Sequence, residues 1–256
     1  MPMGKSFVFV NQKGGVGKTT SAINIGAYLA EAGKSVLLVD FDSQANLSSG
    51  IGINEKLAKP GVYELISGLA PLEEVIKPSP QKGLSVIPSH IDLSGAAVEL
   101  IEQEERDFFL KHALEPARDT FDYILIDCPP SLGVLTLNGI AAANEVLIPM
   151  QCEYFAMEGL SHLLQAVKRI QKSLNPTLEI SGIFFTMYDP RTRLAQQVVK
   201  EVSAYFTNKV FSTIIPRNIR LSEAPSHGLP VNLYDPQCAG AKAYKSLAQE
   251  VLSRGN

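Results

Sequence analysis

The sequence predicts an α/β fold in which a mostly parallel, twisted sheet carries helices on both faces. Short, continuous runs of Val, Ile and Leu alternate along the chain with longer stretches that have helical spacing. Strands that are apolar throughout are typical of parallel sheets covered on both faces. A glycine-rich segment, NQKGGVGKTT, lies between the first apolar run and the first helical stretch, where phosphate-binding loops occur. We expect one domain over residues 1–256, a length that is ordinary for such a fold.

The first two elements are the clearest. SFVFVN reads as a buried strand, and the stretch TTSAINIGAYLAEAG after the glycine loop reads as a helix. Its residues Ile23, Ala27 and Ala30 repeat at helical spacing, and Gly33 is a plausible stop. The further strands are predicted at SVLLVD, LSVIPS, YILIDCPP, EVLIPM, ISGIFFTMYD and VFSTIIP.

The remaining helices follow or separate these strands. They are predicted near residues 94–118, 133–143, 157–174, 191–206 and 238–253. Between the second and third strands the pattern is irregular, because four prolines punctuate residues 51–82. Loops and short helices are expected in that segment.

The composition favours a globular protein of the cytoplasm. Hydrophobic residues make up 45% of the chain and charged residues 19%, and no apolar run approaches the roughly 20 residues that cross a bilayer. The beginning of the chain does not resemble a secretory signal. Cys128, Cys152 and Cys238 form no C-x-x-C pair and no metal-like cluster with the four histidines. We therefore expect no disulfide and no structural metal.

The charge is unevenly distributed. The net charge of −3 argues against a general nucleic-acid binder. Residues 1–128 carry 11 Lys and Arg against 17 Asp and Glu, whereas residues 129–256 carry 12 against 9. Residues 190–220 hold six basic side chains and one acidic side chain. By composition alone, this basic stretch reads as a solvated helix face.

The glycine loop has the features of a phosphate site. Gly14, Gly15 and Gly17 allow main-chain N–H groups to turn toward phosphate oxygens without a Cβ in the way. The helix that starts near Lys18 adds the positive end of its dipole. Lys18 is predicted to neutralise the β and γ phosphates, and the Thr19 hydroxyl to ligate Mg²⁺.

The same loop departs from the usual G-x-x-x-x-G-K-[ST] pattern in two ways. Gln12 occupies the place of the first glycine, and a second lysine, Lys13, precedes the expected one by five residues. The loss of the first glycine is tolerable, because the later glycines can still form the phosphate-binding turn. The second lysine is not explained by phosphate binding within one loop. The predicted nucleotide-binding residues of the loop are Lys13, Gly14, Gly15, Val16, Gly17, Lys18, Thr19 and Thr20.

Three carboxylates follow predicted strands. Ligands of open α/β sheets bind at the carboxyl ends of the strands, so these side chains are expected near the glycine loop. Asp127 ends YILID and is predicted to hold Mg²⁺ through water. Asp40 and Asp42 end LLVDFD. We assign Asp42 to positioning or activating the attacking water, and Asp40 to the outer shell of the metal.

These motifs together resemble the ParA/Soj-type partition ATPases, a branch of the deviant Walker A group of P-loop proteins that also contains MinD. The matching stretches extend from residue 6 to about residue 250. The K-G-G-x-G-K-T loop is typical of the wider group, and QCEYFAMEG and IPRNIRLSEAPS resemble the partition branch. The stretches are NQKGGVGKTT, LLVDFDSQAN, YILIDCPPSLG, TLNGIAAANEVLIPMQCEYFAMEGL, TMYDPRTRLAQQV and VFSTIIPRNIRLSEAPSHGLP.

The resemblance implies an ATP-driven switch with Mg²⁺. ATP binding is expected to produce a sandwich homodimer with two nucleotides at its interface, and hydrolysis is expected to be slow without partner and DNA. Lys13 would reach the phosphates of the partner subunit's ATP, as an arginine finger does. Lys13, Lys18 and Asp42 are the expected catalytic residues. By analogy, Pro216 and Asn218 lie near the adenine.

The resemblance also implies that the ATP-bound dimer binds double-stranded DNA without sequence preference, which places it on the nucleoid. Two copies of a basic face would then act together, and binding would depend strongly on salt. A centromere-binding partner of the ParB type is expected to stimulate hydrolysis and release the dimer. Arg191 and Arg220 match DNA-contacting positions of the family, and weaker candidates are Arg193, Lys200, Arg217 and Lys245.

Three alternatives remain open. A MinD-like positioning ATPase at a membrane surface would need an amphipathic basic helix at the C-terminus, and the end AYKSLAQEVLSRGN instead reads as a docked helix with a short tail. An electron-transfer ATPase like the nitrogenase iron protein would need paired cluster cysteines, and Cys128 has no evident partner. A regulator that binds ATP but hydrolyses it negligibly is the third.

Overall fold

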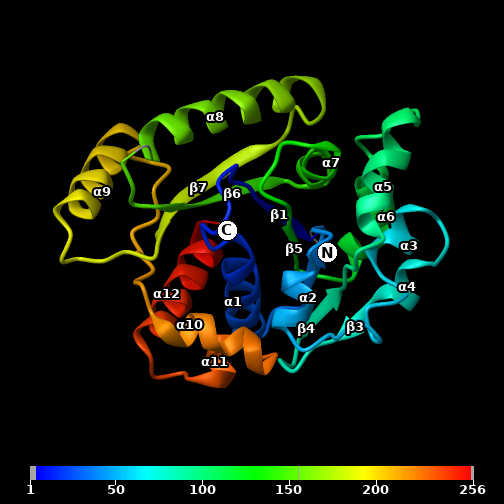
Figure 1. The fold of residues 1–256 in the computed structure, drawn as a ribbon, viewed down its shortest axis with the longest axis horizontal. Helices are drawn as coiled ribbons and strands as arrows, with labels where there is room; N and C mark the ends of the chain where they lie inside the picture. Colours follow the sequence, from blue (N-terminus) through cyan, green and yellow to red (C-terminus); the bar gives the residue numbers. More distant parts are fainter. Residues whose placement is uncertain (1–3, 155, 255–256) are drawn as a thin grey trace.

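A seven-stranded sheet forms the centre of the molecule. The computed structural model describes residues 4–154 and 156–254. Its strand order is β3-β4-β2-β5-β1-β6-β7, and neighbouring strands run parallel except β3 with β4 (Figure 1). This arrangement confirms the predicted fold class. The strands are β1 (Lys5–Phe9), β2 (Val36–Asp40), β3 (Lys77–Pro78), β4 (Leu84–Ile87), β5 (Tyr123–Asp127), β6 (Glu145–Gln151) and β7 (Glu179–Thr186).

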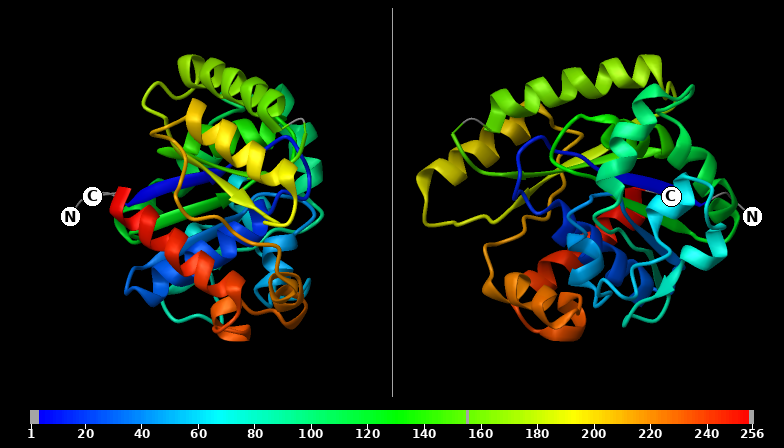
Figure 2. Two further views of the ribbon diagram at one scale, coloured as in Figure 1. Left: turned by 90° about the vertical axis from the view of Figure 1, so that its left-hand side faces the viewer. Right: turned by 45° about the vertical axis from the view of Figure 1, so that its right-hand side comes forward.

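Helices cover both faces of the sheet (Figures 1 and 2). The layer on one face contains α1 (Lys18–Glu31), α2 (Asn46–Gly50), α10 (Ile219–Glu223), α11 (Val231–Tyr234) and α12 (Ala239–Arg254). The layer on the other face contains α3 (Val62–Ile66), α4 (Leu72–Val75), α5 (Leu93–Glu99), α6 (Phe109–Leu114), α7 (Val134–Ala142), α8 (Ala156–Ser173) and α9 (Arg193–Tyr205). Three 3₁₀ segments complete the elements: η1 (Leu100–Glu102), η2 (Glu115–Asp119) and η3 (Ala224–His227).

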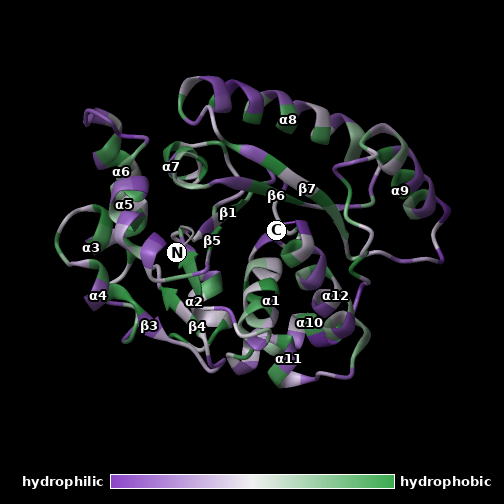
Figure 3. Ribbon diagram, turned by 180° about the vertical axis from the view of Figure 1, so that it is seen from behind, coloured by the Kyte–Doolittle hydropathy of each residue, from purple (hydrophilic) through white to green (hydrophobic). Residues whose placement is uncertain are grey.

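Alternation along the strands divides the core into two. In β1, Phe7 and Phe9 pack with α1 and α12, whereas Val8 packs with the helices of the other face. Successive side chains of a strand point to opposite faces, so a strand that is apolar throughout supplies both cores. The long outer helix α8 alternates between hydrophilic and hydrophobic residues along its turns (Figure 3). Its Leu160 and Leu163 are buried toward the sheet.

The predicted strand VFSTIIP is wrong as a regular strand. This segment runs along the edge of β7 and makes only two isolated bridges, Ile183 with Val210 and Tyr188 with Pro216. Between the bridges, the amides of residues 212 and 213 donate to the carboxylate of Glu250 on α12, at 2.8 and 2.7 Å. A side chain therefore takes the hydrogen bonds that a continuous ladder would have used.

The predicted helix over residues 94–118 is interrupted. The structure has α5 and η1, then an irregular segment, then α6 and η2. The helical stretch ends at Gln103, which is extended with ψ 144°, and Glu105 two residues later has a left-handed φ of 57°. The helix predictions near 133–143, 157–174, 191–206 and 238–253 are confirmed to within a few residues, and residues 51–82 contain short helices and loops as expected.

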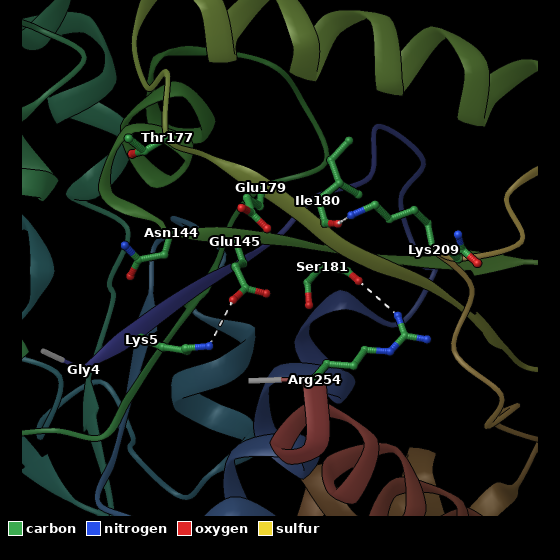
Figure 4. A pocket seen from close by; sticks show the side chains of 11 residues that line it. Gly4, Lys5, Asn144, Glu145, Thr177, Glu179, Ile180, Ser181, Lys209 and Arg254 are labelled. Atoms are coloured by element: carbon green, nitrogen blue, oxygen red, sulfur yellow. Dashed lines mark hydrogen bonds and ion pairs between the residues drawn. The ribbon is translucent and has the colours of Figure 1, made fainter. Parts of the chain in front are cut away.

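The amino end of β7 lies at the edge of the sheet, beside a hollow of about 680 Å³ (Figure 4). The ammonium group of Lys209 donates to the carbonyl oxygen of Ile180 at 2.7 Å, and the Arg254 guanidinium donates to that of Ser181 at 3.1 Å. The same guanidinium lies 3.9 Å from the ring centroid of Phe211. These cations cover main-chain acceptors of an edge strand, which protects the edge from pairing with another sheet.

At the opposite end of the strands, polar residues converge. β5 lies between β1 and β2, and Asp127 is in register with Phe9 on one side and Asp40 on the other. The chain passes from β1 into the glycine loop at this end. The predicted ligand edge is therefore assembled from three neighbouring strands.

Candidate functional site

The glycine loop joins β1 to α1 in the geometry that the sequence predicts. Gly15 and Gly17 have φ of 71° and 87°, a left-handed conformation that side chains with a Cβ rarely adopt. Gly17 caps the amino end of α1, which begins at Lys18. An added Cβ at Gly14 or Gly15 would meet no atom within 4 Å, so the loop surface is open. Main-chain N–H groups and the helix dipole make this surface attractive to an anion.

Side chains from the two neighbouring strand ends hold the loop in place. The amide of Gln151, at the end of β6, donates to the carbonyl oxygen of Gly15 at 2.7 Å. The hydroxyl of Thr186, at the end of β7, donates to the carbonyl oxygen of Val16 at 2.8 Å. No site role was predicted for either residue from the sequence. The available signal was their position at the carboxyl ends of predicted strands, which is where ligand-edge residues occur.

Lys18 is a nearly buried cation beside three acidic groups. Only 7% of the residue is exposed, and its ammonium group donates to the carbonyl oxygen of Asn11 at 3.3 Å. Burial lowers the pKa of Lys18, while the nearby Asp127, Cys128 and Asp42 act in the opposite direction. An ammonium group that is poorly solvated gains strongly from an incoming anion. The role of Lys18 at the β and γ phosphates stays a prediction.

Thr19 and Asp127 meet directly. The Thr19 hydroxyl donates to Oδ2 of Asp127 at 2.6 Å. Oδ1 of the same carboxylate is buried and has no hydrogen-bond partner among the described residues. Burial raises the pKa of Asp127 to about 8, the neighbouring Asp40 adds to the rise, and the Thr19 hydrogen bond opposes it. A buried carboxylate with an unused oxygen is suited to a cation, and a hydroxyl with a carboxylate suits Mg²⁺.

Asp40 is fully buried and already well supplied with donors. One carboxylate oxygen accepts from the amide and the hydroxyl of Ser48 in α2, at 2.8 and 2.6 Å. The other accepts from the amide of Asp42 at 3.3 Å. Burial raises the pKa of Asp40 to about 6, although these hydrogen bonds oppose the rise. In this arrangement Asp40 ties the segment of Asp42 to α2, and its outer-shell metal role stays a prediction.

Asp42 lies in the turn that follows β2. It is half-buried, and its Oδ1 accepts from the amide of Gln44 at 3.1 Å. Ala45, three residues later, has φ 51°, which is strained for a residue with a Cβ. Asp42 is close enough to Lys18 and Asp127 to influence the pKa of each. The water-positioning side chain predicted from the sequence therefore belongs to the same polar cluster.

We predict that Asp127→Asn stabilises the protein when nucleotide and metal are absent. The pKa of Asp127 is raised to about 8 in the folded protein from a value near 3.9 in the unfolded chain. The contribution of Asp127 to the free energy of unfolding is therefore fully present below about pH 4 and is lost as the pH rises to about 8. In EDTA at pH 8 the variant should melt at least about 3 °C above the wild type, and by less at pH 6. Differential scanning calorimetry measures this, with the exposed Asp119→Asn as control. Equal melting temperatures of Asp127→Asn and the wild type at pH 8 would show that the Asp127 carboxylate does not destabilise the fold.

Lys13 contacts the connection between β6 and α8 instead of its own loop. Its ammonium group forms an ion pair with Glu153 and lies 3.4 Å from Oε1 of Gln151. Half of the side chain, 51%, is exposed. Lys13 therefore differs sharply from the nearly buried Lys18, although both belong to one loop. An ion pair between two exposed side chains costs little free energy to open.

A second hollow, of about 320 Å³, adjoins the loop on the side of β7. Gly17 and Thr20 line it together with Pro216 and Asn218. The side chain of Asn218 accepts from the amide of Arg220 and so caps α10. The two residues expected near the base are thus brought beside the phosphate loop from about 200 residues away in the sequence. Met187 and Tyr244, to which the sequence led us to assign no site role, line the same hollow.

The six candidate DNA-contacting residues occupy α9, α10, α12 and the connections before α9 and α10. The guanidinium of Arg191 binds Asp189 at 2.9 and 2.7 Å. Arg220 pairs with Glu223 at 2.8 Å and lies 3.3 Å from Asp235. Lys245 pairs with Glu31 at 2.8 Å. The remaining three, which are exposed, are Arg193, Lys200 and Arg217.

Three further observations concern the described residues outside this site. Within residues 4–154 and 156–254, no group of three or more His, Cys, Asp or Glu side chains is arranged to hold a metal ion. No described helix is long and apolar enough to cross a membrane. The apolar face of α12, including Tyr244, Leu247 and Val251, is buried against the rest of the protein.

Comparison with known proteins adds independent information. Residues 4–180 match the family described as "AAA domain". The chain is 64% identical over 252 residues to "Chromosome-partitioning ATPase Soj" of Treponema pallidum, with 98% of each chain covered. It is 52% identical over 253 residues to "Sporulation initiation inhibitor protein Soj" of Bacillus subtilis, covering 99% of this chain and all of that one.

A solved structure shares the fold throughout. It is that of cobyrinic acid a,c-diamide synthase from Mycobacterium smegmatis, with bound ATP analogue and magnesium. The two superpose with a TM-score of 0.86 at 35% identity, covering 98% of this chain and 96% of the other. Nucleotide and magnesium therefore bind a protein with this arrangement of strands and helices.

Proposed function

The chain belongs to the Soj/ParA family of chromosome-partitioning ATPases, and from that membership we propose that it is an ATP-driven switch for DNA segregation. ATP and Mg²⁺ bind the monomer, two monomers close around two nucleotides, and the dimer binds DNA. A ParB-type partner then stimulates hydrolysis, and the dimer is released. The observation that carries this proposal is the pair of lysines in one loop, one nearly buried and one half exposed.

The nucleotide chemistry follows from the loop and the strand ends. The main-chain N–H groups of residues 14–19 surround the phosphates, and Lys18 neutralises charge on the β and γ phosphates. Thr19 and Asp127 would hold Mg²⁺, which supplies further neutralisation of the triphosphate when bound. Pro216 and Asn218 flank the base. Most of the catalytic effect in such a site comes from positioning and electrostatic stabilisation.

Dimerisation completes the site. We assign Lys13 to the phosphates of the partner subunit's ATP, where a cation supplied in trans stabilises the charge that develops during transfer. The γ-phosphate then favours the dimer, because it is the group nearest to the second subunit's lysine. Lys13 must leave its ion pair with Glu153 to do this.

Asp42→Ala is the variant that tests the switch. Loss of the carboxylate should remove water positioning while Thr19 and Asp127 still support Mg²⁺. We expect ATP binding and the ATP-bound dimer to persist and hydrolysis to fall by about 100-fold or more. Phosphate release and size-exclusion chromatography with ATP measure the two effects. Normal hydrolysis by the variant would show that Asp42 does not position the water.

DNA binding is assigned to the basic residues around α9, α10 and α12. In the monomer the two strongest candidates are paired with carboxylates of their own chain, Arg191 with Asp189 and Arg220 with Glu223. These pairs are exposed, so they cost little to rearrange around a phosphate. Two copies in a dimer double the number of cations that meet the DNA backbone. Affinity should therefore fall steeply with salt.

Arg191→Glu and Arg220→Glu are expected to weaken DNA binding at least about tenfold each while leaving the ATP-dependent dimer intact. The reversal removes a phosphate contact and adds a repulsive charge. Fluorescence anisotropy with random-sequence duplex DNA at fixed salt measures the affinity. Arg169→Glu on the exposed side of α8 is the matched control. If both variants bind DNA as the control does, the DNA face lies elsewhere.

A further inference from the structure

A row of main-chain amides in the glycine loop has no hydrogen-bond partner. Among the described residues, the N–H groups of residues 14–17 donate to no acceptor, whereas the preceding amide of Lys13 donates to the side chain of Asn11 at 3.0 Å. The loop surface beside Gly14 and Gly15 is open. Unpaired N–H groups in such a turn form a concave site for an anion when they point to the same side. The direction in which these amides point therefore decides whether the loop can bind a phosphate group.

Two side chains fix the carbonyl groups of this segment on the side of the sheet. Gln151 and Thr186 are paired in register at the ends of β6 and β7. The Gln151 amide donates to the carbonyl oxygen of Gly15 at 2.7 Å, and the Thr186 hydroxyl donates to that of Val16 at 2.8 Å. Both peptide bonds are trans, and in a trans peptide the C=O group and the following N–H group point in opposite directions. The amides of Val16 and Gly17 are therefore directed away from the two strand ends.

The orientation of the Gln151 amide is set by its other contacts. Its nitrogen also lies 2.9 Å from Sδ of Met187, and its oxygen lies 3.4 Å from the ammonium group of Lys13. A rotation of the amide by half a turn would bring its oxygen against the carbonyl oxygen of Gly15 and its N–H groups against the Lys13 cation. Both of these contacts would be repulsive. Gln151 therefore acts toward Gly15 as a hydrogen-bond donor.

Thr186 reaches the loop from a buried position. Only 2% of the residue is exposed, and its hydroxyl lies 2.8 Å from the carbonyl oxygen of Val16 and 3.2 Å from that of Met150. The hydroxyl has one proton, so the shorter contact is the stronger hydrogen bond. The methyl group of Thr186 would lie 3.7 Å from a Cβ added at Gly17, so the side chain also packs beside the last glycine of the loop. Gln151 and Thr186 thus hold two successive peptides through separate hydrogen bonds.

We propose that Gln151 and Thr186 are positioning residues for the nucleotide, and that they aim the N–H groups of Val16 and Gly17 at a phosphate group. Each acts through the loop, by holding the carbonyl group of the peptide whose amide is to donate. An amide that already points toward the phosphate needs no reorientation on binding, so more of its hydrogen-bond energy contributes to affinity. This inference rests on the proposed function, in which the glycine loop binds the phosphates.

The first measurement is the affinity of the full chain for Mg-ADP by isothermal titration calorimetry. Thr186→Val keeps the shape of the side chain and removes the hydroxyl, and Gln151→Met keeps its length and removes both donors. Each variant should bind Mg-ADP about tenfold more weakly, a difference of roughly 1.4 kcal/mol. Thr186→Ser, which retains the hydroxyl, should bind nearly as the wild type does. Gln165→Met on the exposed side of α8 is the control for Gln151→Met.

The second measurement is the NMR chemical shift of the two amide protons with saturating Mg-ADP, which reports on the N–H groups themselves. In the wild type both protons should move downfield, because each acquires a hydrogen bond to a charged oxygen. In Gln151→Met the movement should be reduced mainly for Val16, and in Thr186→Val mainly for Gly17. Each side chain holds one of the two peptides, so the pattern should follow the peptide that has lost its support.

Failure of this inference is distinguishable from failure of the proposed function. If the wild type does not bind Mg-ADP, or binds it with no downfield movement of either amide, the proposed nucleotide site is wrong and the inference with it. If the wild type responds and both variants match it, only the positioning roles are overturned. Weaker binding without the residue-specific pattern also overturns them, since a structural role, or a direct contact of Thr186 with the base whose hollow it lines, would give that result. Weaker binding with the pattern supports both.

Discussion

Lys18→Ala is expected to abolish productive ATP binding, with a loss of affinity of about 100-fold or more. Only 7% of Lys18 is exposed, and its ammonium group is near enough to Asp127 for each to shift the pKa of the other. In a site of this kind a desolvated cation interacts with phosphate far more strongly than a solvated one. Its removal also leaves the acidic strand ends facing the triphosphate, so the remaining charge repels the ligand.

Isothermal titration calorimetry with Mg-ATP measures the effect of Lys18→Ala, and the exposed Lys56→Ala serves as control. Circular dichroism establishes that the variant is folded. Lys18→Gln, which keeps most of the side-chain volume, separates loss of charge from loss of packing. Unchanged ATP affinity in both folded variants would remove Lys18 from the phosphate site.

Lys13→Ala is expected to weaken the ATP-bound dimer much more than it weakens ATP binding by the monomer. ATP binding by the monomer should change by less than about threefold, because the Lys13 ammonium contacts Glu153 and Gln151 in the free chain. The ATP-dependent dimer should weaken by about 100-fold or more, since two such lysines, one from each subunit, would be lost from the interface. Hydrolysis should fall along with the dimer.

Calorimetry at concentrations below the dimerisation range gives the monomer affinity, and analytical ultracentrifugation with ATP gives the dimer constant. Lys82→Ala, on the exposed connection before β4, is the matched control. If Lys13→Ala weakens ATP binding by the monomer more than it weakens the dimer, Lys13 binds the nucleotide of its own subunit. The assignment of Lys13 to the partner subunit's ATP is then wrong.

Much of the site could be predicted from the sequence, because several of its residues belong to recognisable local sequence motifs. Lys18 and Thr19 stand in a glycine loop between a strand and a helix, and Asp127 ends an apolar strand. Parallel strands place their carboxyl ends at one edge, so these residues had to approach one another. The Thr19–Asp127 contact at 2.6 Å is the direct result.

The side chains that hold the glycine loop in place could not be predicted from local sequence patterns. Gln151 and Thr186 act by donating to main-chain carbonyl oxygens of residues more than a hundred positions away, at 2.7 and 2.8 Å. Nothing in the local sequence of either residue distinguishes a donor to a distant loop from an ordinary strand end. The same limit explains the wrong strand at VFSTIIP, where Glu250 of α12 takes the main-chain donors.

The hydrogen-bond partners of Asp40 could not be predicted from its spacing to Asp42. Its position two residues before Asp42 suggests a pair of carboxylates acting on the metal and the water. In the fold, its oxygens accept from Ser48 and from the amide of Asp42. Ser48 lies on α2, a short helix that was not predicted from the sequence, so the contact is a product of tertiary packing.

If one glycine loop serves two subunits, the mass of the protein in solution depends on ATP, and light scattering measures that mass. The mass of the wild type and of Lys13→Ala is measured without nucleotide, with Mg-ADP and with Mg-ATP, at a concentration where each binds nucleotide fully. We expect a monomer of about 27.8 kDa in the first two states and a doubled mass for the wild type with Mg-ATP only. A mass that does not depend on ATP, or a Lys13→Ala dimer as stable as the wild type, would contradict it.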